Sequence, residues 1–114
     1  MDNRESIIRG LVLKYFLAFS SKDIVALEAM FSSDITLQDW QVSAQNKDEV
    51  IQAIGDIFRS VNSINVKPIN IFVHDLKVFG ELEIIINNEE VIEVIDIIKF
   101  NNDFLIKSIK AYKG

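Results

Sequence analysis

The chain has 114 residues, 49% of them hydrophobic, and carries a formal net charge of −5 with a pI near 4.8. This length suits one continuous core, so residues 1–114 are expected to form a single domain. The acidic balance, without any cluster of Lys and Arg, argues against nucleic acid as a partner. The absence of cysteine excludes disulfides, thiolate metal sites and a cysteine nucleophile.

The beginning of the sequence has no pattern typical of a targeting segment. Residues 1–5 lack the basic and then apolar layout of a signal peptide. The apolar stretch from Leu11 to Phe19 is too short to span a bilayer and is interrupted at Lys14. These features predict a cytoplasmic protein with no membrane partner.

A first helix is predicted from the N-terminus to Phe19. Asp2 followed by Glu5 resembles a capping box, in which two side chains satisfy free N–H groups at the helix start. Apolar side chains then recur every three or four residues, and Tyr15 lies on the same face. The inward stripe is Ile8, Leu11, Val12, Tyr15 and Phe19.

Two further helices are predicted before residue 62. Asp23 is a suitable N-cap for a short second helix, and Ser32-Ser33-Asp34 is then expected to form a turn. Asn46 and Glu49 repeat the capping signature ahead of a third helix. Its apolar stripe consists of Val50, Ile51, Ile54, Ile57, Phe58 and Val61.

One strand is predicted between the second and third helices, from Ile35 to Trp40. From Asn65 onward β-branched residues increase, and turn signals occur at residues 79–81, 87–88 and 101–103. Short turns favour pairing of consecutive strands, so we expect an antiparallel meander with Pro68 near an edge or a bulge. Its four strands are Val66–Lys77, Leu82–Ile86, Glu89–Phe100 and Phe104–Tyr112.

Helices that precede strands predict an α+β fold, with three N-terminal helices packed on one face of a curved, mostly antiparallel sheet. Several strands are apolar on both faces, as in Ile84-Ile85-Ile86. The second face of such a sheet must also be covered, and we expect another copy of the chain to cover it. The protein is therefore predicted to be a homodimer that associates through its sheet.

Two aspartates lie where the strand pattern predicts inward-facing apolar side chains. Alternation places Asp39 on the side of Ile35 and Leu37. It places Asp96 with Ile92, Val94, Ile98 and Phe100. An unpaired carboxylate in such surroundings is destabilising, so it binds donors, opens onto a pocket, or keeps its proton through a raised pKa. Each outcome serves an enzyme, which makes both aspartates candidate site residues.

The order of these elements resembles the NTF2-like superfamily, in its SnoaL-like and ketosteroid-isomerase-like branch. The resemblance rests on Tyr15-Phe-Leu-Ala-Phe-Ser-Ser-Lys-Asp23, on Phe31-Ser-Ser-Asp34-Ile-Thr-Leu-Gln-Asp39 and on Asp96-Ile-Ile-Lys-Phe100. It extends from the first helix to Tyr112. The resemblance implies a cone-shaped fold whose helices and sheet enclose one apolar pocket.

In the isomerases a carboxylate base removes a proton next to a ketone, while donors stabilise the oxyanion that forms. The resemblance implies that Asp39 is this base and that Tyr15 and a protonated Asp96 form the oxyanion hole. It also implies that no cofactor is needed and that the ligand is a small apolar molecule. The residues expected to line the pocket are Phe19, Trp40, Phe58, Val94 and Ile98.

Three interpretations of the site are open from the sequence. The first is an isomerase-type proton transfer next to the carbonyl of a small hydrophobic ketone or enone. The second is a non-catalytic module that binds a small ligand or acts as a dimeric adaptor, in which Tyr15 is a core residue and Asp39 caps a strand end. The third is a SnoaL-like cyclase or hydratase, which shares an Asp acid/base. The only histidine, His74, has no companion ligand, so it is expected at the surface and no metal site is predicted.

Overall fold

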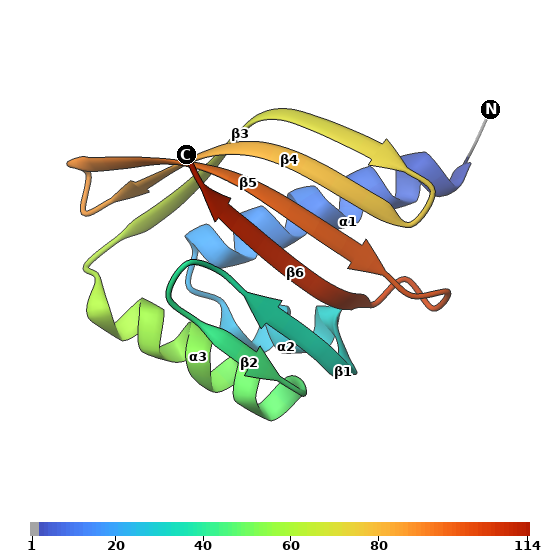
Figure 1. The fold of residues 1–114 in the computed structure, drawn as a ribbon, viewed down its shortest axis with the longest axis horizontal. Coiled ribbons are helices and arrows are strands. Elements are labelled where there is room, and N and C mark those ends of the chain that lie inside the picture. Colours follow the sequence, from blue (N-terminus) through green and yellow to red (C-terminus); the bar gives the residue numbers. More distant parts are fainter. Residues whose placement is uncertain (1–2) are drawn as a thin grey trace.

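The computed structural model describes residues 3–114. Within this range the helices are α1 (Asn3–Ser20), α2 (Ile24–Met30) and α3 (Lys47–Ser60). The strands are β1 (Phe31–Gln38), β2 (Ser43–Gln45), β3 (Ile64–His74), β4 (Lys77–Ile86), β5 (Glu90–Phe100) and β6 (Ile106–Lys113). They form one sheet in the order β2-β1-β6-β5-β4-β3 (Figure 1). None of the helices in this range is both long and apolar enough to cross a membrane.

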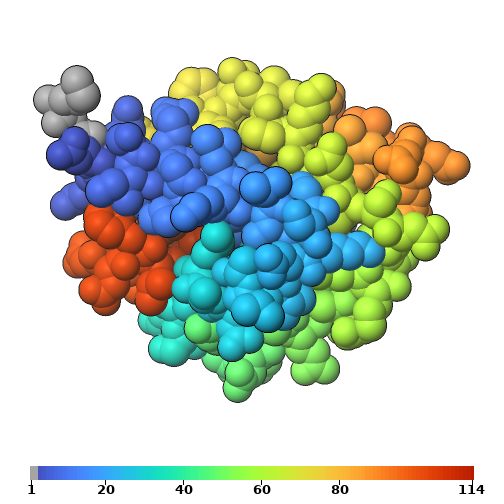
Figure 2. Space-filling model, turned by 180° about the vertical axis from the view of Figure 1, so that it is seen from behind, coloured from blue at the N-terminus to red at the C-terminus, as the bar shows by residue number. Residues whose placement is uncertain are grey.

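The helices pack against one face of the curved sheet, which we call the inner face; the opposite face is the outer face. α1 lies along β3 and part of β4, whereas α3 packs against β1 and β2 (Figure 1). Seen from behind, α1 and α2 lie side by side over the sheet (Figure 2). Neighbouring strands are antiparallel except for β1 and β6, which are parallel. The predicted α+β architecture is confirmed.

The starts of α2 and α3 are set by side-chain caps, as predicted. The carboxylate of Asp23 accepts a hydrogen bond from the N–H of Ala26 at 3.1 Å. The side-chain oxygen of Asn46 accepts one from the N–H of Glu49 at 3.1 Å, and the Glu49 carboxylate accepts one from the N–H of Gln45 at 3.1 Å. The first two bonds satisfy N–H groups in the first turns of α2 and α3. Glu49 bonds the residue before the N-cap, because the N–H of Asn46 itself donates to the carbonyl oxygen of Ile35 at 2.9 Å.

α1 supplies the largest share of the helical core. Its buried residues are Ile8, Val12, Tyr15, Phe16 and Ala18. Leu11 and Phe19, which were expected to point inward, are half-buried at the edges of this stripe. Of the predicted capping pair at the start of the helix, Asp2 lies outside the described residues.

The sheet has one strand more than predicted between the second and third helices. Residues Ser32-Ser33-Asp34 do not form a turn; they belong to β1, which starts at Phe31. The pairing of β1 with β6 shifts register between Phe31 and Thr36, so this part of the strand is irregular. β2 follows as a second, antiparallel strand. With only three residues it is too short to produce a periodic pattern in the sequence.

The four-stranded meander is confirmed, but its first turn is not where it was predicted. The chain reverses at Asp75 and Leu76, with a φ of 54° at Asp75, and not at residues 79–81. Gly80 instead lies inside β4, directly opposite Asp96 of β5. A Cβ atom at Gly80 would lie 3.5 Å from the Phe16 ring, which is an ordinary van der Waals contact, so Phe16 of α1 packs over this position of the sheet beside Asp96.

Pro68 lies where a strand tolerates proline. β3 is an edge strand of the sheet, and its pairing with β4 shifts register between Pro68 and Asn70. Proline has no N–H group to donate, but the regular backbone hydrogen bonding between β3 and β4 is already interrupted at this point. The predicted edge or bulge position of Pro68 is confirmed.

Lys22 joins the loop between α1 and α2 to the end of α3. Its ammonium donates to the carbonyl oxygens of Phe58 at 2.9 Å, Val61 at 2.7 Å and Asn62 at 3.2 Å. Carbonyl groups at a helix C-terminus lack partners within the helix, and the helix dipole favours a cation there. Lys22 thus fixes the wall that α3 contributes to the interior.

Replacing Lys22 by Met is expected to lower the free energy of unfolding by about 1–3 kcal/mol, because the carbonyl groups lose a charged donor. Urea denaturation followed by circular dichroism measures this change. The matched control is Lys14→Met on the exposed face of α1, which should change stability by less than about 0.5 kcal/mol. Equal effects of the two substitutions would contradict the capping role.

Candidate functional site

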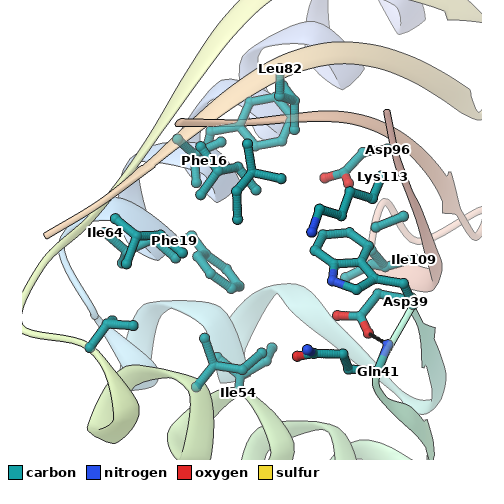
Figure 3. A pocket seen from close by; sticks show the side chains of 18 of the residues that line it. Phe16, Phe19, Asp39, Gln41, Ile54, Ile64, Leu82, Asp96, Ile109 and Lys113 are labelled. Atoms are coloured by element: carbon teal, nitrogen blue, oxygen red, sulfur yellow. Dashed lines mark hydrogen bonds between the residues drawn. The ribbon is translucent and has the colours of Figure 1, made fainter. Parts of the chain in front are cut away.

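A cavity of about 480 Å³ lies between α1, α3 and the inner face of the sheet. This volume suits a small organic molecule. In Figure 3 the side chains of Asp39, Gln41, Asp96 and Lys113 gather on one side of the hollow. Apolar side chains form most of the remaining wall, among them Phe16, Phe19, Ile54, Ile64 and Leu82 (Figure 3). A ligand in this cavity would contact one polar and one apolar side.

Asp96 lies in the middle of β5, and its side chain is only 7% exposed. Its cross-strand neighbours are Gly80 in β4 and Ala111 in β6, which are too small to cover the carboxyl group. Burial, and secondly the charge of Asp39, raise the pKa of Asp96 from 3.8 to about 7. Asp96 therefore retains its proton through most of the acidic range, and the protonated carboxyl can donate a hydrogen bond.

Tyr15 projects from α1 into the same cavity and is 4% exposed. Its ring packs against three phenylalanine rings, with centroid distances of 5.5 Å to Phe16, 5.9 Å to Phe19 and 6.3 Å to Phe31. Burial, and secondly the charge of Asp96, raise the pKa of Tyr15 well above 10. The phenol thus remains a hydrogen-bond donor at any physiological pH.

The polar ends of Tyr15 and Asp96 have no hydrogen-bond partner within residues 3–114. Every fully buried side-chain N or O atom in this range has such a partner. The two oxygen-bearing groups are therefore not sealed in the core but reach the open space of the cavity that they line. Buried Tyr and Asp side chains usually have partners, so both groups are available to a ligand.

Asp39 lies just after β1, at the start of the turn into β2. Its Oδ1 atom accepts hydrogen bonds from the N–H groups of Gln41 and Val42, both at 2.7 Å. These bonds hold the side chain in one orientation, while no described residue donates to Oδ2. The half-buried Asp39 both caps the strand end and lines the cavity. Capping of the strand end is therefore compatible with a position at the cavity.

Two of the five additional residues expected at the pocket wall, Phe19 and Trp40, line the cavity. The other three do not. Phe58 lies against Phe19, ring edge to ring face at a centroid distance of 5.0 Å. Val94 and Ile98 are buried at 2% and 0% exposure, on either side of Asp96 along β5. The alternation of the strand gives the correct face for both. Ile98 lies beyond Asp96, the last lining residue of β5, whereas Val94 lies between the lining residues Ile92 and Asp96 and is nevertheless buried.

The sequence analysis missed the polar residues at the cavity mouth. Lys113 is one of them, and its Nζ atom lies 6.0 Å from the centroid of the Trp40 ring. The alternation of β6 continues from Ile109 and Ala111 to Lys113, so a strand prediction extended by one residue would have found it. The polar lining residues missed are Gln41, Ser60, Asn87, Glu90 and Lys113.

The one histidine does not contribute to this site. His74 is exposed at the end of β3 and is absent from the cavity wall. Within residues 3–114 no group of three His, Cys, Asp or Glu side chains could hold a metal ion. The ionisable groups of the cavity are thus the carboxylates of Asp39 and Glu90, a carboxyl group with a raised pKa, a phenol and, at the mouth, an ammonium group.

The comparisons with known proteins agree with this architecture. No protein-family model matches the chain, and no curated protein has a significantly similar sequence. Solved structures do match over most of the chain. One is a candidate SnoaL-like polyketide cyclase from Shewanella denitrificans OS-217, with a TM-score of 0.85 and 13% identity, covering 95% of this chain and 90% of that chain.

Two further similar structures have TM-scores of 0.79. An NTF2-like protein of unknown function from Cytophaga hutchinsonii ATCC 33406 is 14% identical and covers 94% of this chain and 89% of that chain. A candidate ketosteroid isomerase from Kribbella flavida DSM 17836 is 10% identical and covers 94% of this chain and 77% of that chain. At these identities the likeness concerns the fold alone, and it shows that this chain has the NTF2-like fold.

Proposed function

We propose that the protein catalyses an isomerase-type proton transfer next to the carbonyl of a small hydrophobic ketone or enone. Asp39 is the base, and Tyr15 and protonated Asp96 donate hydrogen bonds to the oxyanion. One observation carries this proposal. Two donors that have no partner among the described residues share a mostly apolar cavity with a fixed carboxylate, whose charge contributes to the raised pKa of Asp96.

In the first step the free Oδ2 of Asp39 removes a proton from the carbon next to the carbonyl group. The electron pair of the broken C–H bond forms a C=C bond, and the carbonyl oxygen becomes an enolate. Tyr15 and Asp96 stabilise this oxygen; a well-placed donor is worth about 2.7–4 kcal/mol in a transition state. Asp39 then returns the proton to a different carbon, which moves the double bond. A positioned base contributes about 10²–10⁴-fold to such a reaction.

The alternatives use the same cavity in other ways. Two of the similar structures are named as candidate polyketide cyclases, and a cyclase or hydratase would also use an aspartate as acid or base. A fold alone does not fix an activity, because one fold hosts many. The isomerase is favoured here because a carboxyl group with its proton retained is suited to donate to an oxyanion, which a passive binding module does not need.

The test of this proposal is the binding of 4-nitrophenol, which mimics the enolate and whose absorbance reports its ionisation. Wild type should bind the phenolate, and Tyr15→Phe should bind it about tenfold or more weakly through the loss of one donor to a charged oxygen. Asp39→Asn should bind it as tightly or more tightly, because the repulsion by the base is removed.

The same variants should separate binding from catalysis. Asp39→Asn is expected to lose the exchange of deuterium at the carbon next to the carbonyl of small ketones, measured by NMR, although it still binds the phenolate. Lys14→Met is the control, since its side chain lies outside the cavity. Phenolate binding that is unaffected by both Tyr15→Phe and Asp39→Asn would contradict the assignment of the site.

Asp96 should also leave a signature in the pH dependence of stability. Its pKa rises from 3.8 to about 7 on folding, so between these pH values the folded state binds more protons and loses stability as the pH increases. The loss of folding stability over this pH interval amounts to roughly 4 kcal/mol. The Asp96→Asn variant lacks this titrating group. Its free energy of unfolding minus that of wild type should therefore increase by roughly 4 kcal/mol between pH 4 and pH 8. Urea denaturation at several pH values measures it, and a constant difference would refute the assignment.

We also propose that the outer face of the sheet associates with a second copy of the chain. Large apolar side chains on this face are exposed, with Phe72 at 65%, Ile95 at 42% and Tyr112 at 54%. Glu81 and Glu83 lie on the same face as Lys99 and Lys110, so one patch carries both signs of charge. A twofold interface requires such a self-complementary surface.

The association can be tested through Ile95→Lys, which places a charge at the centre of the outer face. We expect a dimer mass for wild type and a monomer mass for the variant in sedimentation analysis. Val25→Lys is the matched control, because Val25 is an exposed apolar residue of α2 (80%), away from the sheet. A monomeric wild type, or a dimer that survives Ile95→Lys, would contradict this interface.

A further inference from the structure

Lys113 is the one positively charged side chain among the cavity-lining residues of the described chain. It is on the inner parity of β6, where Ile109 and Ala111 also line the cavity. In Figure 3 its side chain extends toward the hollow on the side that carries Asp39 and Asp96. Lys110, on the opposite parity of the same strand, does not line the cavity. The alternation of side chains along β6 therefore places the ammonium of Lys113 at the cavity.

The backbone of Lys113 is held firmly by β5. Lys113 is paired with Val94, and the N–H of the following residue, Gly114, donates to the carbonyl oxygen of Glu93 at 2.8 Å. The ammonium lies 6.0 Å from the centroid of the Trp40 ring, at the outer limit of a cation–π contact. The cation and the aromatic ring thus border the same side of the cavity mouth.

This ammonium has no anionic partner among the residues that the structure describes. No carboxylate of residues 3–114 lies within 4.0 Å of it, although the chain carries a net negative charge. Two other acidic residues line the cavity with Asp96, namely Asp39 and Glu90, and neither forms an ion pair with Lys113. Lys113 is exposed, so its charge remains hydrated and available to a ligand at the mouth.

The polar groups of the cavity also differ in depth. Tyr15 and Asp96 are buried, Asp39 is half-buried and Lys113 is exposed. A molecule whose carbonyl oxygen contacts the buried donors must therefore extend past Asp39 toward the mouth. Lys113 supplies the positive charge that attracts an anionic group there, whereas Asp39 and Glu90 repel such a group.

We infer that the substrate is a small hydrophobic carbonyl compound that also bears a carboxylate, and that Lys113 binds this carboxylate at the cavity mouth. The inference rests on the proposed function, since it takes the carbonyl end to be bound by Tyr15 and Asp96. Lys113 is a specificity residue in this arrangement: it selects the charged end of the molecule and leaves the proton transfer to Asp39. Trp40 contacts the apolar segment near that end.

The test compares acids with their uncharged isosteres. The probes are 4-hydroxybenzoate, 4-hydroxyphenylacetate and 3-(4-hydroxyphenyl)propionate, each paired with its primary amide, so that the tether between phenol and carboxylate varies. Calorimetry with wild type, Lys113→Met and Lys110→Met gives the affinities. At least one acid should bind wild type about tenfold more tightly than its amide, and this preference should shrink with added salt.

Lys113→Met should abolish the preference for the acid without weakening the amide, whereas Lys110→Met should retain it. If the amides bind and their binding depends on Tyr15, but the acids bind no more tightly than the amides, this inference is overturned and the proposed function stays intact. An acid preference that persists in Lys113→Met would also overturn it. If neither acids nor amides bind, or if Tyr15→Phe leaves amide binding unchanged, the proposed function fails together with the inference.

Discussion

The site depends on one buried carboxyl group. Asp96 lies among apolar side chains in the middle of a strand, and burial makes its ionisation unfavourable. The small residues opposite it, Gly80 and Ala111, do not cover its carboxyl group, which therefore borders the cavity. Phe16 of α1 packs over Gly80. The raised pKa of Asp96 is thus a result of how the helix and the sheet pack. Its proton is what makes this carboxyl a donor.

The remaining polar groups are held around Asp96 by local structure. Tyr15 is fixed by aromatic packing within and beside α1, and Asp39 by two backbone N–H groups of the turn after β1. The bonds of Lys22 to the end of α3 fix the opposite wall. The cavity is therefore bordered by preorganised groups, and binding of a ligand need not order them first.

Much of this arrangement could be predicted from the sequence, because strand and helix periodicity assign faces. Alternation placed Asp39 and Asp96 on the inner face, and helical spacing placed Tyr15 beside them. Periodicity assigns a side chain to a face but does not show whether neighbouring side chains cover it, which is why Val94 and Ile98 were expected at the wall although they are buried beside it. The glycine at position 80 suggested a turn, whereas it lies inside β4, opposite Asp96. The three residues of β2 are too few for any pattern.

Asp96 keeps its proton at the wall of the cavity because of burial and the neighbouring charge of Asp39. The most direct measurement is an NMR titration of the Asp96 carboxyl carbon in wild type and in Asp39→Asn. We expect the pKa of Asp96 to be about 7 in wild type and lower in the variant, since one of the two causes is removed. An Asp96 that titrates near 3.8 in wild type, or that is unaffected by Asp39→Asn, would contradict it.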